Sequence, residues 1–330
     1  MRFALTTEQL DFAASLRDML SGSTAAIRSW ADGDSAPGRK LLSRIADSGV
    51  TALAVPERSG GLGAGPVDLV VAFVELGRAG VPGPLVETAA AVPTLLTELN
   101  EETLAAQWLA PLAAGTALAA LVLPPWVPRA ADADVADLVL VLDGDRLGTG
   151  TPVASFGSVD PARHLFEVAM TQELARGAAV ARAAQRALDV GALAAAAQLW
   201  GAGRALLDVT TDYARSRVQF GRPIGSFQAI KHQLADVLVA LEMSQPLLYG
   251  AAVALASGTD TNARDVSAAK VAAGAAAYRA ARTALQVHGA IGYTAECDLS
   301  LCLTKVRALQ ASWGTAAVHR ARIAAALAGT

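Results

Sequence analysis

Apolar residues recur every three or four positions along the first third of the chain, which predicts a series of helices from residue 1 to about 112. Thr6 or Thr7 can cap the first of these helices. Further helices are expected near 38–48, 66–79 and 85–99, because Gly and Pro separate the apolar runs there. A turn-rich loop, AVPERSGGLGAG at 54–65, lies between two of them.

The pattern changes between residues 113 and 177. The segment VADLVLVLDGDRLGTG is rich in β-forming residues, and its Asp143-Gly144 pair is typical of a hairpin turn. HLFEVAM, at 164–170, predicts another short strand. Ala-rich runs with helical spacing then continue to the end. We therefore expect a mostly α fold, in which an N-terminal helical domain (1–112), a reduced β-domain (113–177) and a C-terminal four-helix bundle (178–330) follow one another.

The segment from Thr103 to Pro128 carries no charged residue and is long enough to cross a bilayer. Prolines and a glycine divide it, so we expect a short helix, a turn and a buried strand near 117–123 instead of a membrane span. The N-terminus has acidic residues within its first eleven positions and no long apolar run. It does not resemble a signal peptide.

Composition narrows the class of protein. Of 330 residues, 53% are hydrophobic and 17% charged, which is enough apolar surface for a sizeable core. The net charge of −3 and the lack of clustered Lys and Arg argue against a nucleic-acid partner. Cys297 and Cys302, the two cysteines, fit reduced thiols in a cytoplasmic protein, and four scattered histidines make a metal site improbable.

Two short stretches concentrate polar and glycine residues at helix ends. RVQFGRPIGSFQAIKHQLAD begins at Arg217, and a guanidinium beside an exposed helix start suits phosphate oxygens. A solvated helical hairpin is the alternative that the spacing leaves open. QVHGAIGY begins at Gln286, and Gly289 and Gly292 let the chain turn sharply or approach a ligand closely. His288 fits a structural role better than that of a ligand.

Together these motifs resemble the acyl-CoA dehydrogenase family. AVPERSGGLG is similar to the family's P-E-x-x-G-G-L-G loop, and QVHGAIGYTAE to its Q-x-x-G-G-x-G-Y motif, with Ala290 at the second glycine. RVQFGRPIGSFQAIKHQLAD is similar to R-x-x-F-G-x-P-I-x-x-F-Q-x-x-x-x-x-L-A-D, and the helical, β, helical order is the family's order. The resemblance implies an FAD enzyme that removes the α-proton of an acyl-CoA with a carboxylate base and transfers the β-hydrogen to the flavin.

The chain departs from the family at the positions of that base. The usual Glu-Gly-Thr signature falls on Trp313-Gly314-Thr315, and an indole cannot accept the proton. Some branches carry the base on the first long C-terminal helix, where the position is about Gly191 and the nearest carboxylate is Asp189. We therefore assign no catalytic residue. Trp313 is expected to fill the vacated acyl site or, alternatively, to shape the pocket of a partner.

The seat of the flavin ring also departs from the family. Leu123-Pro124-Pro125-Trp126 stands where the family has T-E-P-x-x-G-S-D, and no W-I-T-N strand follows. By contrast, the resemblance implies that two kept motifs bind the pyrophosphate and adenosine end of an FAD seated in a neighbouring subunit. The implied cofactor-binding residues are Arg217, Gln219, Phe220, Gln228, Gln286, Gly289 and Ala290.

This combination resembles the short, catalytically incomplete subunits of actinobacterial α2β2 acyl-CoA dehydrogenases that degrade steroids such as cholesterol. The resemblance implies an FAD shared with a longer catalytic subunit and an acyl-CoA or steroid-CoA substrate. Two alternatives stay open. One is an active homo-oligomer with Asp189 or Glu296 as the base, and the other is a scaffold or acyl-CoA-binding protein without FAD.

Overall fold

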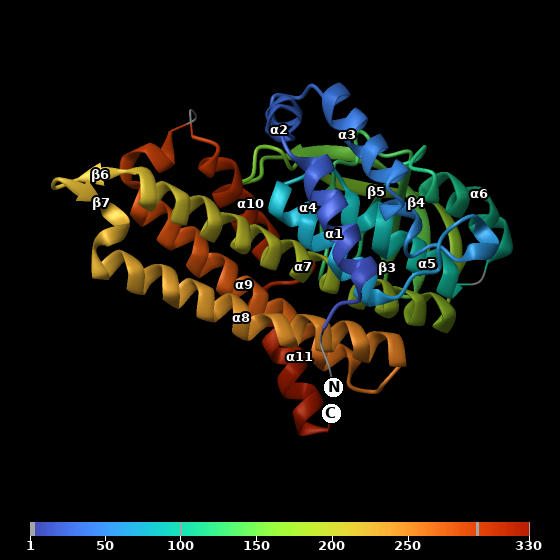
Figure 1. Cartoon of the computed structure of the whole chain (residues 1–330). Coiled ribbons are helices and arrows are strands. Elements are labelled where there is room, and N and C mark those ends of the chain that lie inside the picture. Colours follow the sequence, from blue (N-terminus) through green and yellow to red (C-terminus); the bar gives the residue numbers. More distant parts are fainter. Residues whose placement is uncertain (1–3, 100, 295–296, 330) are drawn as a thin grey trace.

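The computed structural model describes residues 4–99, 101–294 and 297–329 as a block of helices, a small sheet and a bundle of long helices (Figure 1). Thr6 caps the first helix, since its hydroxyl accepts a hydrogen bond from the Gln9 backbone while the Gln9 side chain accepts one from the Thr6 backbone. The helices of the first block are α1 (Thr7–Leu20), α2 (Thr24–Ala31), α3 (Ala36–Asp47), α4 (Pro66–Ala79), α5 (Val92–Leu99) and α6 (Glu102–Ala113).

Short turns complete this block. The 3-10 turns η1 (Val50–Ala52) and η2 (Glu57–Ser59) shape the loop before α4, and the π-helical turn η3 (Glu87–Ala91) runs directly into α5. The predicted helix over 66–79 is confirmed, and the one over 85–99 is a helix interrupted by η3. α2 was not predicted from the sequence pattern.

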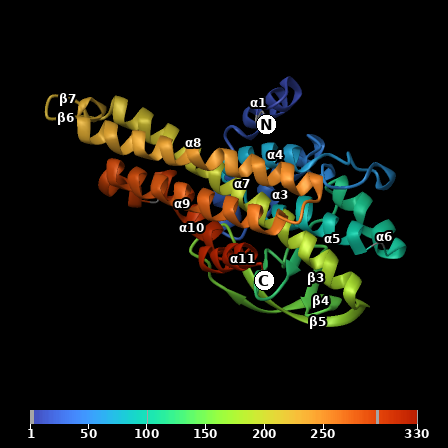
Figure 2. The same cartoon turned by 90° about the horizontal axis from the view of Figure 1, so that it is seen from below.

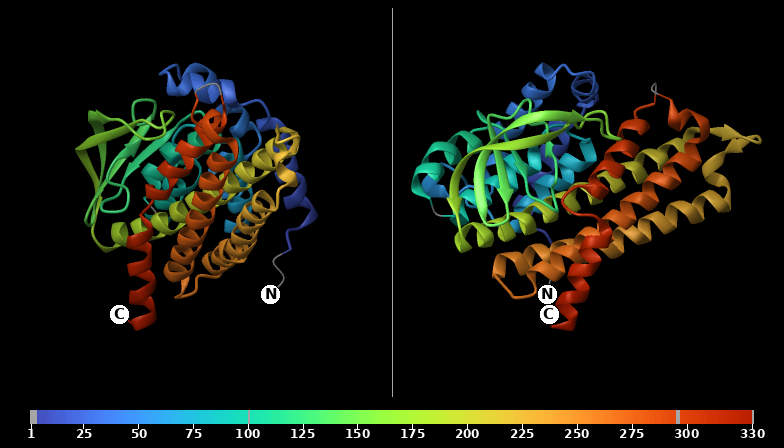
Figure 3. Two further views of the ribbon diagram at one scale, coloured as in Figure 1. Left: turned by 90° about the vertical axis from the view of Figure 1, so that its left-hand side faces the viewer. Right: turned by 180° about the vertical axis from the view of Figure 1, so that it is seen from behind.

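The strands β1 (Ala119–Val122), β2 (Ala130–Ala131), β3 (Leu138–Asp143), β4 (Arg146–Phe156) and β5 (Leu165–Arg176) form one sheet in the order β1-β3-β4-β5-β2. β1 pairs with β3 in parallel, and the other pairings are antiparallel. Asp143 faces Arg146 across the predicted hairpin. Figure 3 shows this sheet on one side of the helical block. The uncharged segment Thr103–Pro128 thus forms most of α6, a turn and β1.

The remaining chain forms the bundle: α7 (Ala178–Ser216), β6 (Val218–Gln219), β7 (Arg222–Pro223), η4 (Ile224–Ser226), α8 (Gln228–Ser257), α9 (Asn262–His288), η5 (Gly289–Tyr293), α10 (Leu299–Ala311) and α11 (Ala316–Ala328). α7 packs against α4 on one side and against α8, α9 and α10 on the other (Figure 2). Small residues make this close approach possible. A Cβ on Gly201 of α7 would lie 2.0 Å from the Val74 carbonyl oxygen of α4.

Within the described part of the chain, α7 and α8 are long and apolar enough to cross a membrane by length and composition. For α7, 89% of the most apolar window is buried inside the protein, which identifies it as the core helix of the bundle. For α8, the buried share is 39%, so this helix leaves apolar side chains uncovered.

Candidate functional site

A two-stranded hairpin projects from the end of α7 that lies far from the sheet (Figure 1). Arg217 ends α7, where its N–H donates to the Tyr213 carbonyl over 2.8 Å and its own carbonyl accepts from Ile224 over 2.8 Å. Phe220 (φ 53°) and Gly221 (φ 76°) form the turn. A left-handed conformation is unusual for an aromatic residue, and it leaves Phe220 91% exposed.

Several side chains around the hairpin are exposed. The Arg217 side chain makes no hydrogen bond or ion pair with the other residues that the structure describes, whereas Gln219 donates to the neighbouring Val218 carbonyl over 2.8 Å. Gln228 begins α8 and is exposed. No side chain caps α8, because Phe227 occupies the cap position. An exposed helix start therefore lies beside an unpaired guanidinium.

The second motif lies at the end of α9, on the same end of the bundle. Gly289 ends the helix with φ 65° and ψ −143°, which a residue with a side chain rarely adopts. The His288 ring stacks on Tyr213 of α7 at 4.1 Å between centroids, and its Nδ1 donates to the Ala284 carbonyl over 2.8 Å. His288 is therefore structural, as predicted, and it fixes α9 against α7. Gln286, Gly289 and Ala290 are all exposed.

A groove of about 470 Å³ begins at this second motif. Arg282 and Arg307 flank the Tyr278 ring, and a hydrogen bond from Arg282, followed by the two positive charges, lowers the pKa of Tyr278. Two guanidinium groups beside Gln286 suit an anionic ligand. Tyr278 and Arg282 lie outside the matched motif, although they are eight and four residues before Gln286 and so share its helix face. The groove is lined by Tyr278, Ala281, Arg282, Leu285, Gln286, Gly289, Tyr293, Leu303 and Arg307.

Trp313 lies in the interior, between α10 and α11, and is 2% exposed. Its indole packs on Gly191 of α7, where a Cβ would lie 2.3 Å from an indole carbon. The two positions at which the resemblance would place a base are therefore in contact, and neither carries a carboxylate. Trp126 packs on the residue that follows Trp313, since its carbonyl accepts a hydrogen bond from the Gly314 N–H over 3.1 Å.

Buried polar side chains fix the turn that holds Trp313. Lys270 donates to the Leu309 carbonyl over 3.0 Å, and burial lowers its pKa to about 7. His319 Nε2 donates to the Trp313 carbonyl over 2.8 Å, so its Nδ1 can accept from the Ser267 hydroxyl at 3.1 Å. Burial lowers the pKa of His319 to about 4, which keeps the imidazole neutral. Hydrogen bonds from Lys270 and His319 thus fix the backbone before Trp313 and at Trp313 itself.

Little space is left around the indole. A cavity of about 30 Å³ remains, which holds only one or two water molecules. Glu87, in the π-helical turn η3, lines this cavity, and burial raises its pKa to about 7 against the opposing effects of a backbone hydrogen bond and of the Arg163 charge. Glu87 was not among the predicted site residues, although a lone carboxylate within an apolar run is a signal of a buried functional group. Asp132, Arg163 and Lys305 line the same cavity, so it contains charged groups of both signs but has no room for a substrate.

Of the two alternative bases, the structure describes Asp189, which is held in an ion pair. Asp189 lies on α7 with its Oδ1 2.7 Å from the Arg322 guanidinium of α11. Burial raises the pKa of Asp189 while Arg322 opposes that shift. The carboxylate is thus held in an ion pair between two helices. Glu296 lies outside the residues that the structure describes.

The contact between Trp313 and Gly191 can be tested by a double-mutant cycle. Gly191→Ala should destabilise the chain by about 3 kcal/mol, because the new Cβ overlaps the indole. Trp313→Ala should cost about 3–5 kcal/mol. Since the smaller side chain removes the overlap, Gly191→Ala should become neutral or stabilising in the Trp313→Ala background. Urea denaturation measures all four stabilities.

Gly274→Ala on α9 is the matched control, because the nearest neighbour of its Cβ would lie at 3.8 Å. A gain of about 1 kcal/mol is expected there, since Ala favours a helix over Gly. Additive losses at positions 191 and 313 would contradict the packing described above.

Glu87→Gln should change how stability depends on pH. The folded chain keeps the Glu87 proton up to a pKa of about 7, whereas the ordinary value is 4.5, so the wild type loses stability as the pH rises between these values. The Gln variant lacks that loss. From pH 4.5 to 7 the difference in unfolding free energy should therefore shift in favour of the variant by up to about 3 kcal/mol. A pH-independent difference between the two denaturation series would show that Glu87 is ionised in the folded chain.

Comparisons with known proteins agree with the fold and the motifs. The sequence matches the acyl-CoA dehydrogenase N-terminal domain over residues 6–116 and the acyl-CoA dehydrogenase C-terminal domain over residues 180–328. It is 38% identical over 260 residues to acyl-CoA dehydrogenase IpdE2 of Mycobacterium tuberculosis, an alignment that covers 77% of this chain and 75% of the relative. IpdE2 of Mycolicibacterium smegmatis is 35% identical over 257 residues, or 77% and 76% of the two chains.

Solved structures show the same fold. A chain of the ChsE4-ChsE5 complex from Mycobacterium tuberculosis superposes with a TM-score of 0.84 at 23% identity, over 100% of both chains. Glutaryl-CoA dehydrogenase from Mycobacterium smegmatis in complex with FADH2 gives a TM-score of 0.85 at 19% identity, over 99% of this chain and 96% of the other. The motifs, the order of helices and sheet, and these alignments together establish that the chain belongs to the acyl-CoA dehydrogenase family.

Proposed function

We propose that this chain is the shorter, catalytically incomplete subunit of a heterotetrameric, FAD-dependent acyl-CoA dehydrogenase. Its role is to bind the ADP end of an FAD whose reactive ring lies in a longer catalytic subunit. The observation that carries this proposal is a contrast between two sites. The pocket at the base position is filled by Trp313, while the implied nucleotide-binding residues are exposed at the other end of the bundle.

The residues present fit one end of FAD and not the other. Arg217 without a partner, the start of α8 and the arginines of the groove suit pyrophosphate oxygens, and Phe220 offers a surface for a ring. The cavity of about 30 Å³ beside Trp313 holds neither an isoalloxazine ring nor an acyl chain. The bound flavin would supply the hydride acceptor for the β-hydrogen of the substrate. The base for the α-proton must then come from the partner.

The reaction of the complex would be the α,β-dehydrogenation of an acyl-CoA. A steroid-CoA substrate is the class implied by the resemblance to the actinobacterial heteromeric enzymes, and the similarity to a chain of a two-protein complex, ChsE4-ChsE5, is in line with a heteromeric assembly. Unpaired Cys297 and Cys302 agree with a reducing cytoplasm.

An apolar stripe on α8 supports the need for a partner. We define the α8 stripe as Val239, Met243, Pro246, Leu247 and Gly250; Val239 is 61% exposed and Met243 72%. Val239 and Pro246 follow Gln228 by 11 and 18 residues, about three and five helical turns, so they share its face. A subunit that contacts Gln228 would therefore continue over the stripe. An uncovered apolar face of this kind is typical of a protein interface.

Arg217→Ala tests the proposed role of the hairpin. In the co-purified complex, flavin occupancy should fall about tenfold or more, because a charge-assisted contact to phosphate is lost. Absorbance in the flavin bands measures the occupancy, and circular dichroism should show an unchanged fold. Arg215→Ala is the control, since this guanidinium is two residues away and pairs with Asp212 at 3.3 Å. Equal flavin occupancy in the wild type and Arg217→Ala would overturn the assignment.

A double substitution, Val239→Glu with Met243→Glu, tests the α8 stripe. Two buried carboxylates in an interface are unfavourable, so co-purification with the longer subunit should fail while the thermal unfolding of this chain stays unchanged. Leu10→Glu on α1, where the side chain is 55% exposed, should leave assembly intact. Retention of a flavin-loaded pair with loss of the tetramer would assign the stripe to a second copy of this chain, and full assembly would remove it from any interface.

A further inference from the structure

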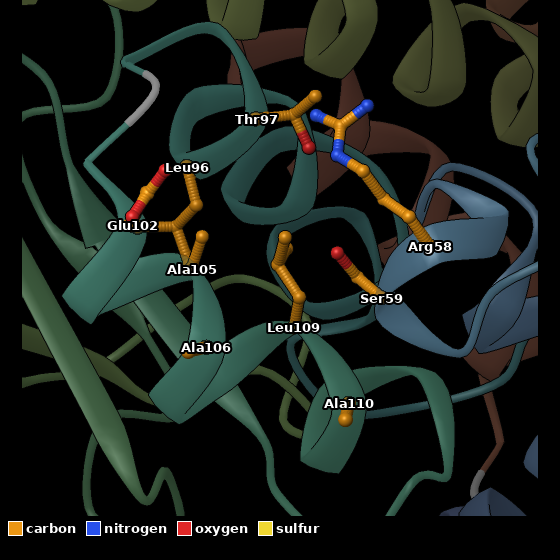
Figure 4. Close-up of a pocket in the computed structure, with 9 residues that line it drawn as sticks. All are labelled: Arg58, Ser59, Leu96, Thr97, Glu102, Ala105, Ala106, Leu109 and Ala110. Atoms are coloured by element: carbon orange, nitrogen blue, oxygen red, sulfur yellow. The ribbon is translucent and has the colours of Figure 1, made fainter.

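A groove of about 410 Å³ lies on the N-terminal helical block, where the turn η2 faces α5 and α6 (Figure 4). It is remote from the hairpin end of the bundle: Figure 1 places α6 and the strands β6 and β7 at opposite ends of the molecule. No function described above uses this groove. It is lined by Arg58, Ser59, Leu96, Thr97, Glu102, Ala105, Ala106, Leu109 and Ala110.

The hollow arises from small side chains and a tightly folded loop. Leu96 of α5 and Leu109 of α6 are buried and form its apolar floor. Ala105, Ala106 and Ala110 line the α6 side, where longer side chains would fill the space. The loop is fixed by Gly61, since a Cβ there would lie 2.1 Å from the Val55 carbonyl oxygen. A volume above 300 Å³ with an apolar floor is in the range of small-molecule sites.

Polar groups without partners line the same groove. The Thr97 hydroxyl oxygen is buried and forms no hydrogen bond. The Arg58 guanidinium and the Ser59 hydroxyl form no hydrogen bond or ion pair with any residue in the ranges that the structure describes. Figure 4 shows the Arg58 side chain reaching from the loop toward Thr97, with the Ser59 hydroxyl directed into the space beside Leu109. A buried hydroxyl left unpaired is unfavourable, and a ligand would relieve that cost.

We propose that this groove binds a small amphiphilic carboxylate. Its carboxylate would accept hydrogen bonds from Arg58, Thr97 and Ser59, the combination of one cation and neutral donors that suits a single negative charge. Its apolar body would cover Leu96, Leu109 and the alanines of α6. Figure 4 shows the Glu102 carboxylate on the side of Leu96 away from Arg58, directed away from the guanidinium. A second negative charge at that end of the ligand would be repelled, which selects a monoanion.

The proposal does not depend on the flavin or on the partner subunit. The groove is made by one chain, and its lining residues are separate from the seven residues implied in cofactor binding. Binding can therefore be measured on the purified chain.

Titration of the full-length chain with octanoate, followed by ligand-detected NMR, tests the proposal. We expect saturable binding of one octanoate per chain, weakened about tenfold by Arg58→Gln and by a smaller factor by the isosteric Thr97→Val. Ala106→Phe should abolish binding, because its ring fills the hollow from an exposed position on α6. Arg320→Gln, which removes the same charge from an exposed position on α11, should bind octanoate like the wild type.

One neutral and one cationic analogue of octanoate serve as controls for the charge. Octan-1-ol and octylammonium should bind much more weakly than octanoate, because Arg58 gains an ion pair only with the carboxylate. Absence of saturable octanoate binding in the folded wild type would overturn the proposal. Octanoate affinity that Arg58→Gln and Ala106→Phe leave unchanged would do so as well.

Discussion

The packing of Trp313 against Gly191 determines what the interior of this chain can hold. A glycine on α7 lets the indole approach the helix backbone closely, and the indole leaves a cavity of only about 30 Å³. Lys270 and His319 hold the carbonyl groups around Trp313, so the indole does not swing aside without breaking buried hydrogen bonds. The family fold is retained, while an indole occupies the position to which the motif resemblance assigns the catalytic carboxylate.

Because the interior is filled, the exposed residues at the hairpin end of the bundle are those left to contact a cofactor or a partner. A stack of His288 on Tyr213 fixes the ends of α9 and α7 relative to one another, which holds both retained motifs on one rigid surface. Arg217 is exposed there without a hydrogen-bond or ion-pair partner among the described residues, and Phe220 is 91% exposed, with only an edge contact to the Phe227 ring at 6.1 Å between centroids. In the proposed assembly, this surface and the uncovered face of α8 contact a subunit that keeps the ring of the flavin and the catalytic base. The proposed assembly needs two unlike chains, because a symmetric pair of this chain would contain the same filled pocket twice and no catalytic base.

The sequence predicted the parts of the fold that depend on local pattern. The bounds of α4 were correct because Pro66 and the glycine after Ala79 mark its ends. α2 was missed because it is only eight residues long and its apolar positions are mostly alanines, whereas contacts of Ile27 and Trp30 with the core stabilise it. The predicted strand at 164–170 extends to Arg176, since its outer half is exposed and polar and is held by pairing with β4. Local pattern carries no information on such long-range pairing.

For the candidate site too, the sequence predicted local motifs but not the contacts between residues far apart in the chain. Sequence motifs identified Arg217, Gln286 and Trp313, but they could not show that positions 191 and 313 are in contact, because this depends on how α10 and α11 return to α7. They also could not find the groove between η2 and α6, which consists of residues that are unremarkable one by one. The most direct test of the account is the ratio of flavin to protein in this chain purified alone and in its complex with the longer subunit. We expect no flavin on the chain alone and one flavin for each unlike pair. Stoichiometric flavin and acyl-CoA dehydrogenase activity in the chain alone would contradict the proposed division of the site between two subunits.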